Sequence, residues 1–132
     1  MNKLKNIMEY NPRNDFIFKK IMASENVKIA KYFTDVILKF HGFEETINFE
    51  PILNHLLPRE HPNEKIRKVD FLAKDGYNRK FIIEMQQRDE YFFRIRSQGY
   101  LDKLFSYSVD TEGYEKVNTH FLISLVNFDF CK

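Results

Sequence analysis

The chain of 132 residues is 43% hydrophobic and 30% charged, a globular balance that fits one domain and argues against disorder. Its net charge of +2 is too small to indicate a nucleic-acid-binding protein by itself. No apolar run is long enough to span a membrane, and residues 1–14 lack the apolar core of a signal peptide. A single cysteine, Cys131, excludes an intrachain disulfide and a cysteine zinc cage, so we expect a cytoplasmic protein.

Two helices are expected in the first third of the chain. Asn14 and Asp15 can cap a helix over 15–23, and Ser24 can cap a second helix over about 25–40 that ends before Gly42. The second helix carries apolar residues at helical spacing, which are expected to form its buried face: Ile29, Phe33, Val36, Ile37 and Phe40.

The pattern then changes to that of strands. Residues 46–50 alternate and predict a strand, and the pattern permits its continuation past Pro51 to Leu57 as a bent edge. Residues 58–65 contain two prolines and form a polar connection.

A hairpin is predicted next. Its first strand covers 66–74, Asp75-Gly76 is a tight hairpin signal, and the return strand covers 79–87. The return strand is apolar on both faces at its start, which is typical of a central, buried strand.

The remaining elements are a helix over 91–108, a turn around 110–113 and an apolar strand over 120–128 of the kind that is buried on both faces. Apolar and small residues follow one side of this helix: Tyr100, Leu101, Leu104, Phe105 and Ser108. Three consecutive strands favour an antiparallel meander, and the helix then carries the chain to a fourth strand. The order therefore predicts an α/β sheet with helices on both faces.

Two polar residues stand in the central strand. Glu84 and Gln86 are two positions apart, so both point to the same face, and burying a carboxylate without a partner is costly. If the hairpin turns near Asp75, Asp70 falls roughly opposite Glu84. Two such carboxylates repel unless a cation lies between them, and Mg²⁺ is the usual solution. The backbone carbonyl of Met85 could be a further ligand, and Gln86 could hold a water beside the ion.

An alternative without a metal stays open at this point. A strand glutamate often pairs with an arginine, and the chain offers several: Arg67, Arg79, Arg88, Arg94 and Arg96.

The order and spacing of several short stretches resemble a known family. The similar stretches are 14–21, 69–76, 81–86, 94–101 and 126–130. A strand with an Asp, a hairpin and a strand with Glu-x-Gln resemble the PD-(D/E)XK nuclease superfamily. The closer resemblance, over about residues 11–130, is to the PD-(D/E)XK nuclease family transposases, also called recombination-promoting nucleases. It implies a restriction-endonuclease-like αβββαβ core with a mixed four-stranded sheet.

The resemblance also implies roles for the acidic residues. Asp70 and Glu84 match the two metal-binding acids, for Mg²⁺ or Mn²⁺, and Gln86 stands where the superfamily often has a catalytic lysine. A neutral amide can orient water but carries no positive charge. Asp15 matches an N-terminal motif and could reach the metal through water, although a helix cap paired with Lys19 explains it equally well.

The same resemblance suggests contacts to DNA phosphates. The candidates are Arg94, Arg96, Gln98, Tyr100 and Lys19. For Tyr100, core packing is the stronger alternative because it lies on the apolar side of its helix.

The expected function is therefore that of a metal-dependent DNA endonuclease in recombination or transposition, whose partner is DNA and which could form a homodimer. The alternatives are a catalytically inactive or truncated nuclease-fold module that binds DNA or a partner, and an α/β interaction domain with no role on nucleic acid. Relative to the family, we expect residues 1–132 to be a single domain that is shortened at its C-terminus.

Overall fold

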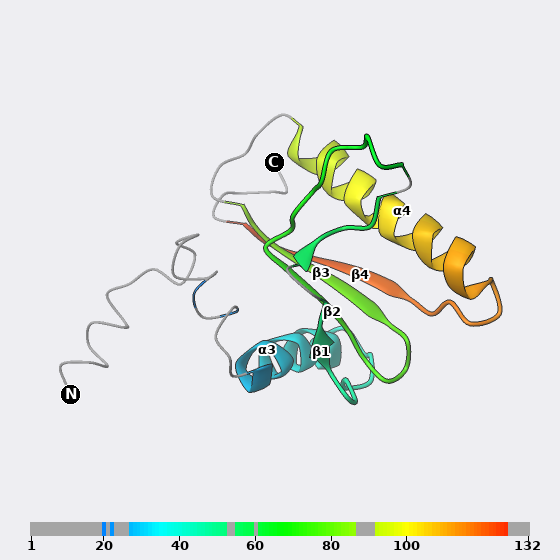
Figure 1. Cartoon of the computed structure of the whole chain (residues 1–132). Helices are drawn as coiled ribbons and strands as arrows, with labels where there is room; N and C mark the ends of the chain where they lie inside the picture. Colours follow the sequence, from blue (N-terminus) through cyan, green and yellow to red (C-terminus); the bar gives the residue numbers. More distant parts are fainter. Residues whose placement is uncertain are drawn as a thin grey trace.

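A four-stranded mixed sheet lies between two helices in the computed structural model, which describes residues 20, 22, 27–52, 55–59, 61–86 and 92–126 (Figure 1). Its elements in chain order are α3 (Val27–Phe40), β1 (Glu50–Pro51), β2 (Phe71–Lys74), β3 (Lys80–Gln86), α4 (Phe93–Glu112) and β4 (His120–Val126). Strands β1 to β3 form an antiparallel meander, and β4 pairs in parallel with β3. This arrangement confirms the predicted fold class, the strand order and the position of helices on both faces. The expected helix over 15–23 lies mostly outside the described residues.

The buried face of α3 differs from the predicted one. Its buried residues are Ala30, Thr34 and Leu38, whereas three of the expected core residues are 44–85% exposed: Ile29, Val36 and Phe40. The charged residues Lys28, Lys31, Asp35 and Lys39 form one stripe, and the apolar residues cover a wider arc of the helix than the part that is buried. The face with Ala30 and Thr34 offers small side chains for close packing, and the Thr34 hydroxyl is satisfied because it donates to the Ala30 carbonyl at 2.8 Å.

Strand β1 is shorter and later than predicted, because it contains only Glu50 and Pro51 instead of residues 46–50. Directly beyond it, the backbone N–H of Ile52 still donates to the Leu72 carbonyl at 2.8 Å, and Nδ1 of His55 accepts a hydrogen bond from the backbone N–H of Leu72 at 3.0 Å. An isolated bridge between Leu56 and Lys68 then stands where a longer first strand and a β2 beginning at residue 66 were expected. Pro51 itself has no N–H to donate to the ladder, and the two-residue strand ends there.

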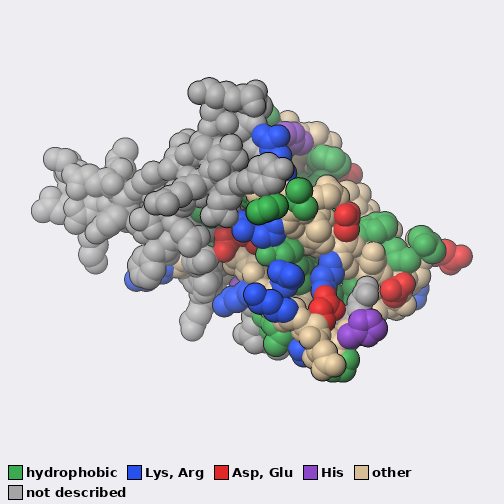
Figure 2. All heavy atoms as spheres, turned by 90° about the horizontal axis from the view of Figure 1, so that it is seen from above, with side chains coloured by type: hydrophobic (Ala, Val, Ile, Leu, Met, Phe, Trp, Pro, Cys, Tyr) green, Lys and Arg blue, Asp and Glu red, His purple; other side chains and the backbone are tan. Residues whose placement is uncertain are grey.

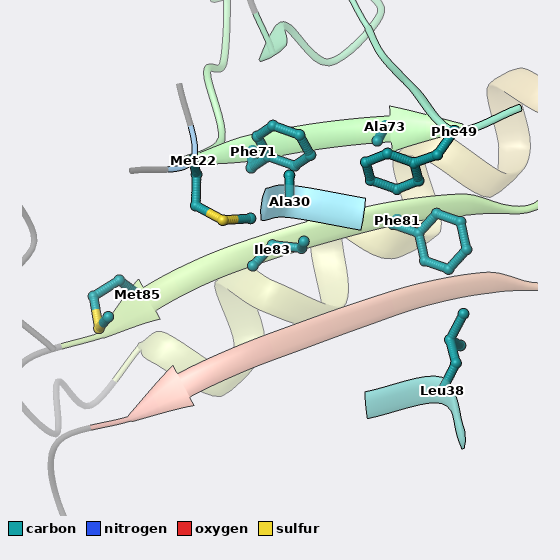
Figure 3. Packing of buried hydrophobic residues seen from close by; sticks show 9 residues of the cluster. All are labelled: Met22, Ala30, Leu38, Phe49, Phe71, Ala73, Phe81, Ile83 and Met85. Atoms are coloured by element: carbon teal, nitrogen blue, oxygen red, sulfur yellow. The ribbon is translucent and has the colours of Figure 1, made fainter. Parts of the chain in front are cut away.

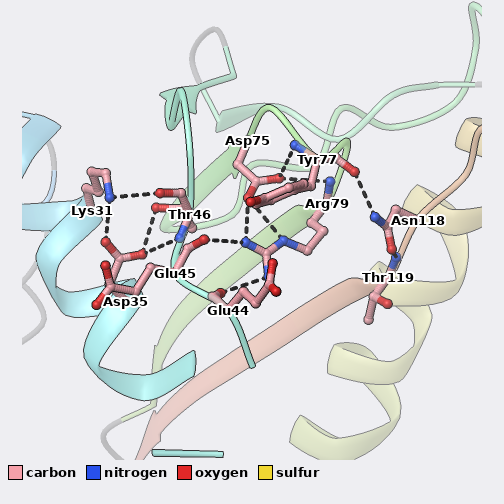
Figure 4. A network of polar contacts seen from close by, with 10 residues as sticks. All are labelled: Lys31, Asp35, Glu44, Glu45, Thr46, Asp75, Tyr77, Arg79, Asn118 and Thr119. Carbon is pink, nitrogen blue, oxygen red and sulfur yellow. Dashed lines mark hydrogen bonds and ion pairs between the residues drawn. The ribbon is translucent and has the colours of Figure 1, made fainter. Parts of the chain in front are cut away.

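The β2–β3 hairpin is held by a buried ion pair, drawn in Figure 4. Arg79 donates from Nη2 and Nε to Oδ2 of Asp75 at 2.7 and 3.0 Å, and the Asp75 side chain is 0% exposed. The other carboxylate oxygen, Oδ1, accepts from the backbone N–H groups of Tyr77 and Arg79. The same guanidinium donates to the carbonyls of Glu44 and Glu45, so it also ties the segment after α3 to the hairpin.

The predicted hairpin is confirmed, but its loop covers residues 75–79, because Lys74 still pairs with Lys80. Asn78 takes the left-handed conformation, with φ of 59°. A side chain at Gly76 would be crowded, since a Cβ atom there would lie 3.0 Å from a side-chain carbon of Ile47, which would have to shift.

Helix α4 extends to Glu112, beyond the predicted end at residue 108, and its buried residues are Phe93, Ser97, Leu104 and Ser108. Phe105 is 44% exposed and does not belong to that face. Strand β4 is an edge strand whose residues are all half-buried, so the prediction that it is buried on both faces is wrong. Its apolar sequence resembles that of a central strand, but within the described sheet β4 has a neighbouring strand, β3, on one side only.

Alternate residues of the sheet face the two helices. One face packs with α3 through a cluster that Figure 3 shows: Met22, Ala30, Leu38, Phe49, Phe71, Ala73, Phe81, Ile83 and Met85. The other face packs with α4 through Leu57, Val69, Leu72, Ile82 and Leu104. Neither described helix has the length and apolar character needed to cross a bilayer.

We predict that Arg79→Met destabilises the protein by about 3 kcal/mol or more, because it leaves the Asp75 carboxylate buried without its cation. The matched control is Lys74→Met, which removes an exposed ion pair with Glu50 and should cost about 1 kcal/mol or less. Urea unfolding of both variants measures the difference. Equal losses would contradict a structural role for the buried pair.

Candidate active site

Asp70 and Glu84 lie opposite each other on the sheet face that α4 covers. The β2–β3 ladder pairs Phe71 with Ile83, and Asp70 and Glu84 are the next positions along the two strands. Because side chains alternate along a strand, both carboxylates share the face of Ile82, which packs against α4. The predicted juxtaposition is therefore present in the structure.

The backbone of β3 fixes the position of the Asp70 side chain. The N–H of Met85 donates to Oδ2 of Asp70 at 2.7 Å. Asp70 and Glu84 are both half-buried, whereas Gln86 is buried. The acidic pair thus sits at the rim of the core and stays partly exposed.

Burial and the negative charge of Asp70 raise the pKa of Glu84 from 4.5 to about 8. A side-chain hydrogen bond between the two carboxyl groups acts in the same direction, while the Asp70 backbone and the positive charge of Arg96 oppose it. Two neighbouring carboxyl groups cannot both ionise at low cost without a cation. Near neutral pH, the metal-free pair therefore keeps a proton.

Gln86 follows Glu84 on the same face of β3 and is held from α4. Nη2 of Arg96 donates to Oε1 of Gln86 at 2.9 Å. Arg96 is also the arginine whose positive charge acts on Glu84. The structure therefore contains both features that the sequence offered as alternatives: an arginine near Glu84 and a second carboxylate, Asp70, beside it. Arg79, another of the arginines considered, is engaged with Asp75 instead.

The residues expected to contact DNA divide between two sides of α4. Arg94 and Gln98 line a cavity of about 390 Å³ between α4 and β4, and Gln98 donates to Asp102 at 2.8 Å. Arg96 and Tyr100 line a different groove of about 430 Å³. Residues at positions i and i+4 share a helix face, which explains this division into two pairs.

The second groove is the more basic of the two. It lies between α4 and the segment around residues 64–67, and Arg67 and Lys103 join Arg96 in its lining. Lys103 forms an ion pair with Glu64 across it. Tyr100 lines the groove and also packs against the buried cluster beneath α4, so both of its expected roles are compatible with its place.

Basic and acidic side chains intermingle on the face seen in Figure 2, with groups of Lys and Arg near single acidic residues. This distribution agrees with the small net charge of the chain. Any attraction for an anion on this face is therefore local, not a property of the whole surface.

Two residues beside the site were not singled out from the sequence. Ser124 of β4 pairs with Glu84 in the parallel ladder, and Lys103 lines the basic groove. A serine within the apolar run Phe121–Val126 was a signal that could have identified the first. Asp15 and Lys19, by contrast, were singled out but lie outside the described residues.

The donor set suits a hard divalent cation. Within the described part of the chain, no group of three or more acidic, histidine or cysteine side chains could hold a metal ion. Two adjacent carboxylates are sufficient for Mg²⁺, which keeps several waters and often takes its remaining ligands from a substrate phosphate. The Met85 carbonyl as a ligand stays a prediction.

We predict that Glu84→Gln raises the melting temperature of the metal-free protein by a few degrees at pH 8 and changes it little at pH 5. Between pH 4.5 and about 8 the folded protein keeps a proton on Glu84 that the unfolded chain loses, so wild-type stability falls as the pH rises through this range. The amide cannot ionise and avoids this loss. Thermal unfolding in EDTA measures it, with exposed Glu115→Gln as the control. An unchanged or lower melting temperature at pH 8 would contradict the raised pKa.

Comparison with known proteins agrees with this geometry. The comparisons with curated proteins and with solved structures each gave no match. The family model of the PD-(D/E)XK nuclease family transposases matches residues 12–132, which include the whole sheet, both described helices and the acidic pair. The chain therefore belongs to the PD-(D/E)XK nuclease family transposases.

Proposed function

We propose that this protein is a metal-dependent endonuclease that hydrolyses phosphodiester bonds of DNA during recombination or transposition. The observation that carries the proposal is the position of Asp70 directly opposite Glu84 on the face beneath α4. Membership of a nuclease family supports the reaction class and the DNA substrate.

In this proposal the two carboxylates bind Mg²⁺ or Mn²⁺. A bound ion of this kind polarises a phosphoryl oxygen and lowers the pKa of an attacking water. Asp70 is held for this task by the Met85 N–H, and Glu84 gives up its proton when the cation replaces it. Gln86 extends the polar face and would orient the attacking water or a phosphate oxygen by hydrogen bonding.

The first turn of α4 favours an anion next to this pair. It contains Arg94 and Arg96 and no acidic residue, although the positive end of the helix dipole usually attracts acidic side chains. The positive end of the helix dipole repels these two arginines, whereas a phosphodiester would be attracted by the dipole and by the arginines. Contacts of this type position a DNA backbone without reading its sequence.

A second function is favoured by one observation, the neutral side chain at position 86. Without a positive charge there, the fold could bind DNA and leave it intact. Such a module would show salt-sensitive DNA binding that needs no metal. A homodimer, which would present one site to each strand of a duplex, stays a prediction.

We predict that the protein nicks supercoiled plasmid with Mg²⁺ or Mn²⁺ and that EDTA abolishes the reaction. Asp70→Asn and Glu84→Gln should each lower the rate about a hundredfold or more, because several kcal/mol of charge stabilisation are lost with the metal. Gel separation of supercoiled, open-circular and linear plasmid gives the rates.

The control is Glu115→Gln, which removes one negative charge from an exposed position beyond α4 and should leave the rate unchanged. Cleavage that survives EDTA, or that is equal in the Glu84 variant, would refute the proposed site. Metal-independent DNA binding without cleavage would support the second function instead.

A further inference from the structure

We infer that Arg96 is a positioning residue for Gln86, holding its amide by the carbonyl oxygen so that Gln86 serves the reaction as a hydrogen-bond donor. This inference rests on the proposed nuclease function, because it assigns a role within the same site.

The contact itself determines which way the amide is turned. A guanidinium group has five N–H donors and no acceptor, so the Gln86 atom at 2.9 Å from Nη2 of Arg96 must be the carbonyl oxygen. The other polar atom of the amide, Nε2, carries donors only. Gln86 is 8% exposed, so its amide is held in place by contacts with the protein, among them the one with Arg96. Any hydrogen bond that Gln86 makes through Nε2 is therefore one in which Gln86 is the donor.

A donor at this place suits phosphoryl transfer. Negative charge in the transition state is spread over the phosphoryl oxygens, and donors fixed in advance stabilise it. A neutral amide is a weak donor, but a hydrogen bond from a cation to its carbonyl polarises it and strengthens the N–H group. Arg96 thus compensates, through Gln86, for the charge that the amide lacks.

The position of Arg96 also distinguishes it from an ordinary surface cation. It lies in the first turn of α4, and its side chain crosses to the buried amide on β3 while its positive charge acts on the Glu84 carboxyl group. Arg94, in the same turn, lines the cavity on the other side of the helix. Of the two, Arg96 is the one for which the described residues show a contact with Gln86 and a charge effect on Glu84.

The pairing can be tested without metal or DNA. In labelled, metal-free protein, Arg96→Met should move the ¹³C resonance of the Gln86 side-chain carbonyl upfield, because the charge-assisted hydrogen bond to that oxygen is lost. Lys39→Met, an exposed lysine in the last turn of α3, should leave it in place. An unmoved resonance in the Arg96 variant would overturn the inference.

The role in the reaction is tested by single-turnover cleavage at saturating DNA and Mg²⁺. Arg96→Met and Gln86→Met should each slow cleavage about tenfold to a hundredfold, and the double variant should be no slower than the worse single one, since the residues act as a unit. The DNA concentration for half-maximal rate should change by no more than about twofold. Lys39→Met should cleave at the wild-type rate.

Adding Gln86→Lys to Arg96→Met supplies a donor with its own charge and should restore the rate to within about tenfold of wild type. Multiplied losses in the double variant, or a change in DNA affinity alone, would overturn the inference and make Arg96 a simple phosphate contact. If wild-type protein does not cleave, the proposed function fails and this role fails with it, whereas the carbonyl resonance still reports the pairing. Melting temperatures of all variants identify any that have lost the fold.

Discussion

The register of the β2–β3 hairpin is the constraint on which the candidate site depends. A slip of one residue would send Asp70 to the opposite face from Glu84, because side chains alternate along each strand. Apolar packing on both faces favours one register, and the ion pair of Asp75 and Arg79 closes the loop that sets it. That pair also holds the segment after α3 through two backbone carbonyls. A polar network at one end of the hairpin therefore supports an acidic pair at the other.

This arrangement has an energetic cost that a ligand can remove. Asp70 and Glu84 are brought together by packing that does not depend on a cation, and the raised pKa of Glu84 records the resulting conflict. Among the described residues, the Met85 N–H at Asp70 and the charge of Arg96 near Glu84 partly compensate for this conflict. Instability of this kind is common where a site is preorganised for a charged ligand. This repulsion explains why the metal-free protein is expected to be less stable than a variant with a neutral side chain at position 84.

The sequence predicted the meander, the following helix and the opposition of Asp70 and Glu84, because these follow from local signals: a turn dipeptide, strand periodicity and spacing from the turn. The predictions from the sequence were wrong where contacts between separate elements determine which residues are buried. The apolar residues of α3 cover a wider arc than the buried face, and they do not show that Ala30, Thr34 and Leu38 are the part that is buried. The apolar sequence of β4 does not reveal that it is an edge strand. The contact of Arg96 with Gln86 joins two elements whose relative position only the fold determines.

The charged residues of α4 are distributed unevenly around the candidate site. The first turn carries two arginines and no acid, against the preference of the helix dipole, and the following turns separate Arg94 and Gln98 from Arg96 and Tyr100. On the second side, Arg96 donates to Gln86 and its charge acts on Glu84, and Arg67 and Lys103 line the same groove as Arg96. A phosphodiester at the pair would thus be bounded by cations on one side of the helix. Glu64 partly neutralises this groove through its ion pair with Lys103, so the attraction for a DNA backbone under the proposed function would depend mainly on Arg67 and Arg96.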